Sequence, residues 1–100
     1  MKHFLIKYRR KAGDGSDWHE QIAAFIVALR ADPELKGRIE YRCMKARDGP
    51  DYYHLAAAAD DVAVKALQSR EFFTRYTAQT KAGAEGPVEV VPLEVIADTA

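Results

Sequence analysis

The tyrosines and His54 are the residues through which this chain could do chemistry. A buried phenol needs a hydrogen-bond partner, so it offers a polar group inside apolar surroundings. Tyr8, Tyr41 and Tyr53 fall on alternate positions of expected strands, and Tyr76 lies in an expected helix. Hydroxyl groups gathered in this way could orient a flat aromatic compound and stabilise its anion. Plain core packing is the alternative interpretation of the same residues.

His54 is the natural candidate for a general base, because the unperturbed pKa of an imidazole lies near neutrality. Strand alternation places it opposite Tyr53, on the face away from the helices, where it would be a buried interface histidine. A bulge in that strand would reverse the parity and bring His54 into a pocket. Cys43 lies in mid-strand and is expected to be buried and inert. The histidines lack a spacing such as His-x-x-x-His, so no metal site is expected.

The same alternation selects the expected pocket lining. The strand residues that we expect to face the helices are Phe4, Ile6, Tyr8, Ile39, Tyr41, Cys43, Tyr53, Leu55 and Ala57. As catalytic candidates we take His54, Tyr41, Tyr53 and Tyr76, and as substrate-binding candidates Tyr8, Ile6, Phe25, Leu55, Ala57, Phe72 and Phe73. Core packing is the favoured interpretation for Phe4, Ile6, Ile39 and Leu55.

Composition indicates one ordinary globular domain over residues 1–100. The chain has 48% hydrophobic and 30% charged residues and a formal net charge of 0. A balanced charge does not favour binding to nucleic acid, which is held largely by phosphate neutralisation. Cys43 is the single cysteine, so no internal disulfide is expected. The N-terminus does not have the pattern of a signal peptide and no apolar run is long enough for a membrane span, so we expect a cytoplasmic protein.

These side chains would be positioned by alternating strands and helices. Residues 3–9 alternate as a strand, and the glycines at 13 and 15 indicate a turn. A helix should start near Asp17, which has capping-box spacing with Glu20, and should end at Asp32, because proline follows. Residues 38–45 and 52–58 read as a hairpin around the turn at 47–51.

The second half of the chain repeats the helix-then-strand order. A helix should start at Asp60 or Asp61 and break near Ser69, and residues 88–96 should form a strand that Pro92 restricts to an edge or a bulge. The order βαββαβ is that of a ferredoxin-like α+β fold, with a four-stranded antiparallel sheet and two helices on one face. The open face would carry Leu5 and Met44, so a second copy of the chain would be expected to cover it as a homodimer.

Several segments together resemble the antibiotic biosynthesis monooxygenase family of dimeric α+β barrel proteins. They are HFLIKYRRKAG, RADPELKGRIEYRCM, DGPDYYHLAAAADD and ALQSREFFTRYTAQTK before PVEVVPLEVI. Ser69 and Phe72 match a Ser-x-x-Phe that members often carry at the break in helix two, and Tyr41 falls where members often have a tyrosine. The resemblance covers almost the whole chain.

The resemblance implies a pocket between sheet and helices in each subunit of a dimer. Some members oxidise phenolic or quinol-like compounds there with molecular oxygen, without metal or flavin. It therefore implies a cofactor-independent monooxygenase of a small aromatic molecule. Ala56–Ala59 stand where members commonly have a tryptophan, which favours a non-enzymatic binding or stress-associated protein as the alternative. A haem-degrading subgroup ligates iron with a histidine near the place of Tyr76, so haem breakdown is disfavoured. An isomerase or lyase of small acids is a third reading.

Overall fold

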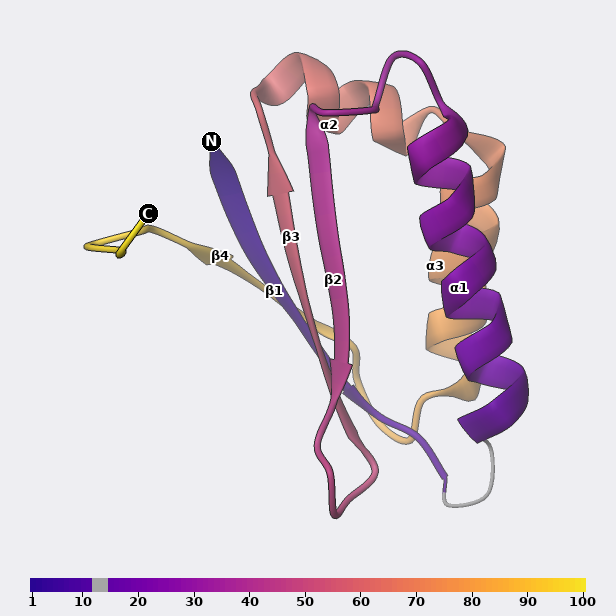
Figure 1. The fold of residues 1–100 in the computed structure, drawn as a ribbon. Helices are drawn as coiled ribbons and strands as arrows, with labels where there is room; N and C mark the ends of the chain where they lie inside the picture. The colour runs from indigo at the N-terminus through magenta and orange to yellow at the C-terminus, as the bar shows by residue number, and fades with distance from the viewer. Residues whose placement is uncertain (12–14) are drawn as a thin grey trace.

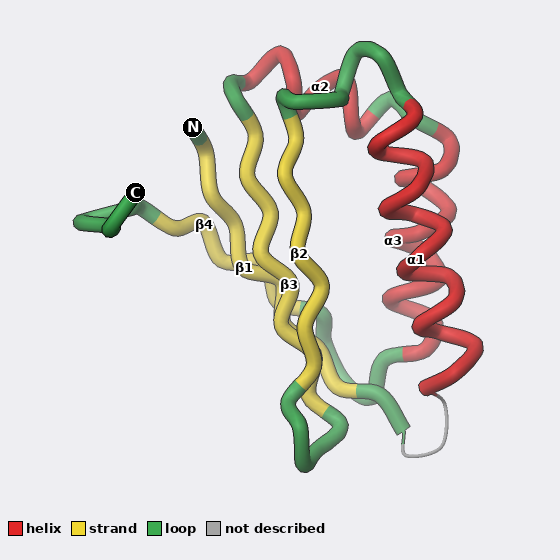
Figure 2. Tube along the Cα trace, in the orientation of Figure 1, coloured by secondary structure: helices red, strands yellow, loops and turns green. Residues whose placement is uncertain are grey.

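The computed structural model describes residues 1–11 and 15–100 and has the expected order of elements (Figure 1). The elements are β1 (Lys2–Arg9), α1 (Gly15–Ala31), β2 (Ile39–Lys45), β3 (Asp51–Ala58), α2 (Asp61–Gln68), α3 (Glu71–Gly83) and β4 (Glu89–Leu93). The turn predicted at Gly13 and Asp14 lies outside the described residues. Figure 2 shows the strands in one layer and the helices in another.

The sheet has four strands in the order β2-β3-β1-β4, and each neighbouring pair is antiparallel. All helices lie on one face (Figure 1), which confirms the ferredoxin-like α+β fold. The expected second helix is divided into α2 and α3 around Ser69, so the helical layer contains three helices rather than two. Asp60 caps α2, since its Oδ1 accepts a hydrogen bond from the amide of Ala63 at 2.8 Å.

Strand β3 is central and pairs with both β1 and β2. Its register with β1 places His54 opposite Ile6 and Tyr52 opposite Tyr8, and its register with β2 places His54 opposite Cys43. Directly opposite residues point to the same face of a sheet. His54 and Tyr52 therefore face the helices, without any bulge, because the β1–β3 pairing is continuous from residue 2 to residue 9.

The sequence-based prediction of which β3 residues face the helices is therefore wrong. Tyr53 and Leu55 lie on the open face with 37% and 40% of their surface exposed, while His54 is fully buried beneath the helices. The two faces of this strand are almost equally apolar, so alternation alone does not select the inner one. The pairing with β1 selects it, because Phe4, Ile6 and Tyr8 cover the helical side of β1.

The core lies between the sheet and α1, with α3 beside it. It consists of Tyr8, Trp18, Phe25, Leu29, Leu35, Tyr52, Leu67 and Tyr76. An ion pair of 2.6 Å between Arg70 Nε and Asp32 Oδ2 joins the break between α2 and α3 to the end of α1. The ion pair therefore helps to hold the two C-terminal helices over the sheet.

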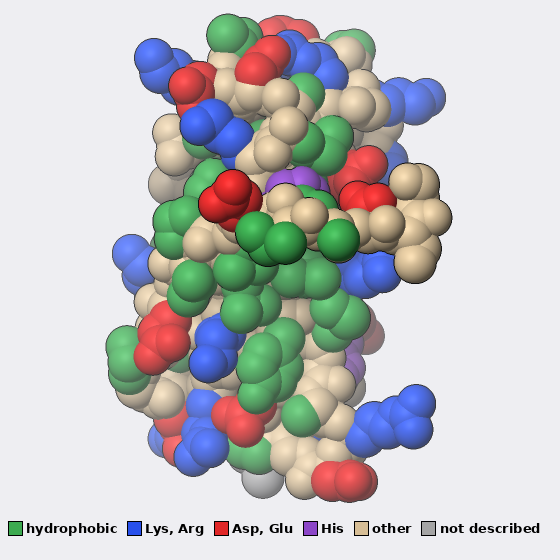
Figure 3. Space-filling view, turned by 90° about the vertical axis from the view of Figure 1, so that its left-hand side faces the viewer, with side chains coloured by type: hydrophobic (Ala, Val, Ile, Leu, Met, Phe, Trp, Pro, Cys, Tyr) green, Lys and Arg blue, Asp and Glu red, His purple; other side chains and the backbone are tan. Residues whose placement is uncertain are grey.

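No helix of residues 1–11 and 15–100 lies on the other face of the sheet (Figure 1). Exposed apolar side chains on or beside it are Met44, Tyr53, Leu55, Val91 and Leu93, and Figure 3 shows hydrophobic surface there with charged groups around it. Pro92 lies in the edge strand β4, in register with Phe4 of β1, which confirms its predicted edge position. The chain then leaves the sheet (Figure 1), and Ile96 is 88% exposed.

Candidate active site

A cavity of about 400 Å³ lies between the helix-facing side of the sheet and the helices α2 and α3. Strands β1, β2 and β3 form the floor of the cavity, and the two helices form its roof. Val88 and Val90, just before and within β4, close one side. Its lining residues are Phe4, Ile6, Ile39, Tyr41, His54, Ala56, Ala57, Ala58, Val64, Leu67, Gln68, Phe73, Tyr76, Thr77, Thr80, Lys81, Val88 and Val90. This volume is sufficient for a small aromatic compound.

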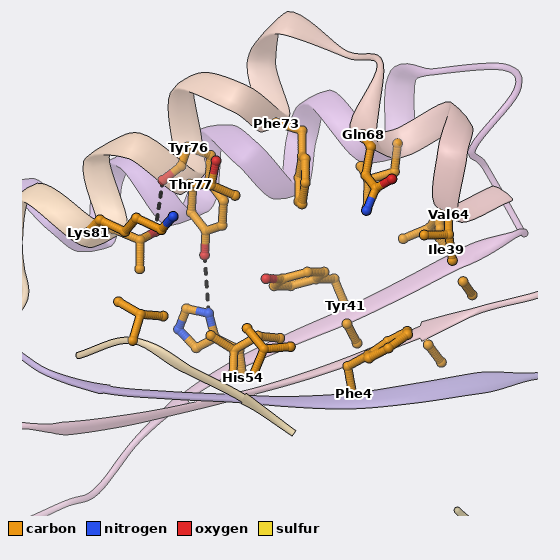
Figure 4. Close-up of a pocket in the computed structure, with 18 residues that line it drawn as sticks. Phe4, Ile39, Tyr41, His54, Val64, Gln68, Phe73, Tyr76, Thr77 and Lys81 are labelled. Carbon is orange, nitrogen blue, oxygen red and sulfur yellow. Dashed lines mark hydrogen bonds between the residues drawn. The ribbon is translucent and has the colours of Figure 1, made fainter. Parts of the chain in front are cut away.

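The cavity has a polar end and an opposite end that is apolar except for Gln68 (Figure 4). His54, Tyr76 and Lys81 lie together at the polar end, and Lys81 is the one Lys or Arg among the lining residues that the structure describes. Ile39 and Val64 lie toward the other end. An aromatic ring bearing a polar substituent could therefore bind with its substituent at the polar end.

His54 is held between two phenols. Its Nε2 lies 2.9 Å from the hydroxyl oxygen of Tyr8, and its Nδ1 lies 3.2 Å from the hydroxyl oxygen of Tyr76. The indole nitrogen of Trp18 donates to the Tyr8 oxygen at 2.8 Å. Strand pairing fixes His54 relative to Tyr8, while α1 supplies Trp18 and α3 supplies Tyr76.

The donors and acceptors among the hydrogen-bonded side chains of Trp18, Tyr8, His54 and Tyr76 can be assigned one bond at a time. Trp18 can only donate, so Tyr8 accepts from it and its own proton is free to go to His54 Nε2. A neutral imidazole then donates from Nδ1 to the Tyr76 oxygen. On this assignment the Tyr76 hydroxyl proton is left for the cavity or for Cys43 Sγ, 3.9 Å away.

Burial keeps these groups uncharged near pH 7. Desolvation lowers the pKa of His54 to about 4 and raises the pKa of the Cys43 thiol to about 11. Desolvation likewise raises the pKa of Tyr8, Tyr41 and Tyr76 above the ordinary phenol value. His54 is thus a weaker base than its residue type indicated, and the buried His54, tyrosines and Cys43 are neutral hydrogen-bonding groups beside the charged Lys81.

The structure places the sequence-predicted site residues in three locations. Ile6, Tyr41, His54, Ala57, Phe73 and Tyr76 line the cavity. Tyr8, Phe25 and Phe72 pack behind it, where Phe25 stacks on Tyr76 with ring centroids 3.9 Å apart. Tyr53 and Leu55 lie on the open face, so the interpretation that they line this pocket is wrong.

Sequence reasoning did not select Trp18, Gln68 and Lys81 as site residues. Trp18 is a buried residue of α1, but nothing local in the sequence indicates that its indole reaches Tyr8. Gln68 and Lys81 are exposed residues that border the cavity. Helical spacing from Phe73, eight residues earlier on the same face, could have indicated Lys81, whereas Gln68 depends on the angle between α2 and α3.

Within residues 1–11 and 15–100, no group of three or more His, Cys, Asp or Glu side chains is arranged to hold a metal ion. None of the helices in this part of the chain has the length and apolar character needed to cross a membrane.

Solved structures with this fold are numerous. Rv0793 from Mycobacterium tuberculosis superposes with a TM-score of 0.79 at 16% identity, covering 99% of this chain and 98% of that one. A protein described as antibiotic biosynthesis monooxygenase gives 0.79 at 15% identity, covering 97% and 100%. SnoaB from Streptomyces nogalater, described as a cofactor-independent oxygenase, gives 0.76 at 14% identity, covering 97% and 94%.

These similarities establish the class of fold: a ferredoxin-like α+β domain of the kind found in antibiotic biosynthesis monooxygenases. The likeness extends over almost the whole of each chain, so the resemblance predicted from the sequence is confirmed at the level of the fold. No protein-family model and no curated protein matches the chain. Activity must therefore be argued from the site itself.

Proposed function

We propose that this protein is a cofactor-independent monooxygenase of a small phenolic or quinol-like compound. The observation that carries the proposal is the apolar cavity of about 400 Å³ with neutral hydrogen-bonding groups gathered at one end. The fold shared with SnoaB, which is described as a cofactor-independent oxygenase, supports it. An aromatic anion held in such a cavity can pass an electron to oxygen directly, and the two radicals can then combine.

Tyr76 and Tyr41 are the groups that we expect to contact the reacting oxygen of the substrate. The Tyr76 hydroxyl is held by His54, and the Tyr41 hydroxyl points toward the same end of the cavity (Figure 4). Neutral phenols donate hydrogen bonds to a developing anion and so stabilise it. His54 acts in this scheme by positioning Tyr76 and Tyr8 rather than by removing the substrate proton.

Lys81 gives the proposal a preferred substrate orientation. Its ammonium group is the positive charge that borders the polar end of the cavity, and its charge would favour the deprotonated form of a bound phenol. The aromatic body would then lie against Phe4 and Phe73, toward the alanines of β3. Substrates with an ionisable hydroxyl at one end and an apolar remainder are therefore expected.

Oxygen consumption tests the activity. Chelator-treated protein is supplied with a panel of hydroquinones, and uptake is compared with that of the protein-free solution. We expect stimulated uptake that falls strongly in Tyr76→Phe and in Lys81→Met. Lys65→Met, which changes an exposed lysine outside the cavity lining, is the matched control and should retain wild-type uptake. Uptake equal to that of the protein-free solution across the panel would exclude the proposal.

A non-enzymatic small-molecule-binding protein is the second candidate. Two observations favour it: the low pKa of His54 removes an effective base, and alanines 56 to 58 leave the end of β3 without a large ring at the cavity. Ligand binding under argon distinguishes the candidates, because Trp18, the single tryptophan, lies behind the cavity and reports on it by fluorescence. Saturable binding without oxygen uptake would support this alternative.

We further propose that the protein is a homodimer formed through the open face of the sheet. Tyr53, Leu55 and Leu93 expose apolar surface there, and the segment after β4 extends beyond the sheet with Val95 and Ile96 exposed (Figures 1 and 3). Exposed apolar surface of this kind typically marks an interface, and a two-fold pair is the commonest closed assembly. Sedimentation equilibrium tests it.

A further inference from the structure

Oxidisable aromatic side chains form a continuous row from the cavity to Tyr52, which is 4% exposed and borders a second hollow. Tyr76, at the cavity, stacks on Trp18 with ring centroids 5.6 Å apart. Trp18 is hydrogen-bonded to Tyr8, and Tyr8 stacks on Tyr52 at 5.0 Å with planes only 3° apart. Tyr8 and Tyr52 also border a second, smaller hollow of about 180 Å³. Oxidisable rings are thus in contact along the whole route.

Each tyrosine of this row has an imidazole nitrogen at its hydroxyl. Tyr76 and Tyr8 share His54, at 3.2 Å and 2.9 Å, and the Tyr52 hydroxyl lies 2.8 Å from Nε2 of His19. A tyrosine that loses an electron becomes a strong acid, so its oxidation in a protein requires a nearby proton acceptor. Core packing alone does not require this recurring tyrosine–histidine pairing.

We propose that Tyr76, Tyr8 and Tyr52, with His54 and His19, form a proton-coupled electron-transfer chain. It carries an oxidising equivalent from the cavity to Tyr52, whose hydroxyl is hydrogen-bonded to the exposed His19. This use of the chain rests on the proposed oxygenase function, because its oxidant is an aromatic radical left in the cavity when superoxide escapes. The final reductant is a soluble hydrogen-atom donor of the ascorbate class.

The first steps balance without creating a buried charge. The substrate radical takes an electron and the hydroxyl proton from Tyr76, which restores the substrate and leaves a neutral phenoxyl radical. Tyr8 then gives an electron to Tyr76 and its proton to His54 Nε2, while His54 Nδ1 returns a proton to the Tyr76 oxygen. The imidazole exchanges one proton for another and stays neutral, as its burial requires.

The last steps deliver the radical to Tyr52, beside the smaller hollow. Tyr52 gives its electron to Tyr8 and its proton to His19, and a proton entering from the cavity through Tyr76 and His54 restores the Tyr8 hydroxyl. Ascorbate then transfers a hydrogen atom to Tyr52, and His19 releases its proton to water. The guanidinium of Arg10 lies 4.4 Å from the Trp18 ring centre, and its positive charge disfavours a tryptophan radical cation. The radical is therefore expected on tyrosine.

The electron-transfer chain can be tested without substrate or oxygen. The result therefore does not depend on whether the protein is an oxygenase. A bulky ruthenium photo-oxidant is flashed with protein under argon, and tyrosyl radicals are followed by electron paramagnetic resonance. Tyr53 is the most exposed tyrosine at 37% and is not a member of the proposed electron-transfer chain. Tyr53→Phe is therefore the reference protein. Tyr52→Phe and Tyr8→Phe are added to it, since phenylalanine keeps each ring but cannot be oxidised.

We expect the Tyr53→Phe protein to retain a tyrosyl radical and the further Tyr52→Phe change to abolish most of it. The Tyr8→Phe change should confine the radical to Tyr52 and shorten its lifetime in ascorbate. Heavy water should slow radical migration in the Tyr53→Phe protein, a readout that does not depend on the folding of further variants. Loss of all radical with Tyr53→Phe alone, or a lifetime unaffected by Tyr8→Phe, would overturn the proposal.

Discussion

Removal of the Tyr8 hydroxyl tests the hydrogen-bonded row at its centre. In Tyr8→Phe the ring stays in place, but the indole N–H of Trp18 and Nε2 of His54 both lose their partner. Trp18 and His54 are fully buried, so water does not replace the hydroxyl in the native packing. An unsatisfied buried polar group costs about 1–3 kcal/mol, so two such groups give an expected loss of about 2–6 kcal/mol in the free energy of unfolding.

Urea unfolding at fixed protein concentration measures this loss, with Trp18 fluorescence as the signal. A domain of this size has a stability of about 5–15 kcal/mol, so the variant should still fold, with a melting temperature lower by about 10 °C or more. Tyr53→Phe removes a hydroxyl from an exposed ring and should change stability by less than about 0.5 kcal/mol. Equal urea midpoints for Tyr8→Phe and wild type would refute the assigned hydrogen bonds.

Three further results are expected. Burial lowers the pKa of His54 to about 4, so below pH 6.5 the unfolded chain takes up a proton that the folded protein does not. The free energy of unfolding should therefore fall by about 3 kcal/mol between pH 6.5 and pH 4. In urea titrations of His54→Gln, the free energy of unfolding should lack this decrease. Ala56→Leu fills the cavity floor and should weaken binding of a hydroquinone measured by calorimetry, whereas Ala59→Leu, outside the lining, should not. Leu55→Lys on the open face should shift sedimentation toward the single chain, whereas Val27→Lys, 63% exposed on α1, should leave the assembly unchanged.

The order of elements could be read from the sequence because each local signal agreed with the final packing. Alternation selected the helix-facing side of β1 and β2 correctly, and the break at Ser69 separates α2 from α3. The alanines at the end of β3 have low strand propensity, yet they form strand because β3 is central and pairs on both edges. Tertiary pairing outweighed propensity there.

The site was less predictable, because its geometry depends on relations between distant segments. Tyr52 and Tyr53 are chemically identical neighbours, and only the register with β1 decides that Tyr52 faces the helices. The hydrogen bond between His19 and Tyr52 joins residues 33 positions apart, and that from Trp18 to Tyr8 depends on where α1 crosses the sheet. The pKa of His54 follows from the same burial, which residue type alone does not indicate.

The fate of molecular oxygen tests the central claim most directly. Metal-free protein is supplied with a hydroquinone under oxygen gas enriched in the heavy isotope, and the product is analysed by mass spectrometry beside a Tyr76→Phe reaction. The proposed function requires a single oxygen atom from the gas in each product molecule, with a strongly reduced yield in the variant. Product without heavy oxygen, or equal yields from wild type, variant and protein-free solution, would contradict it.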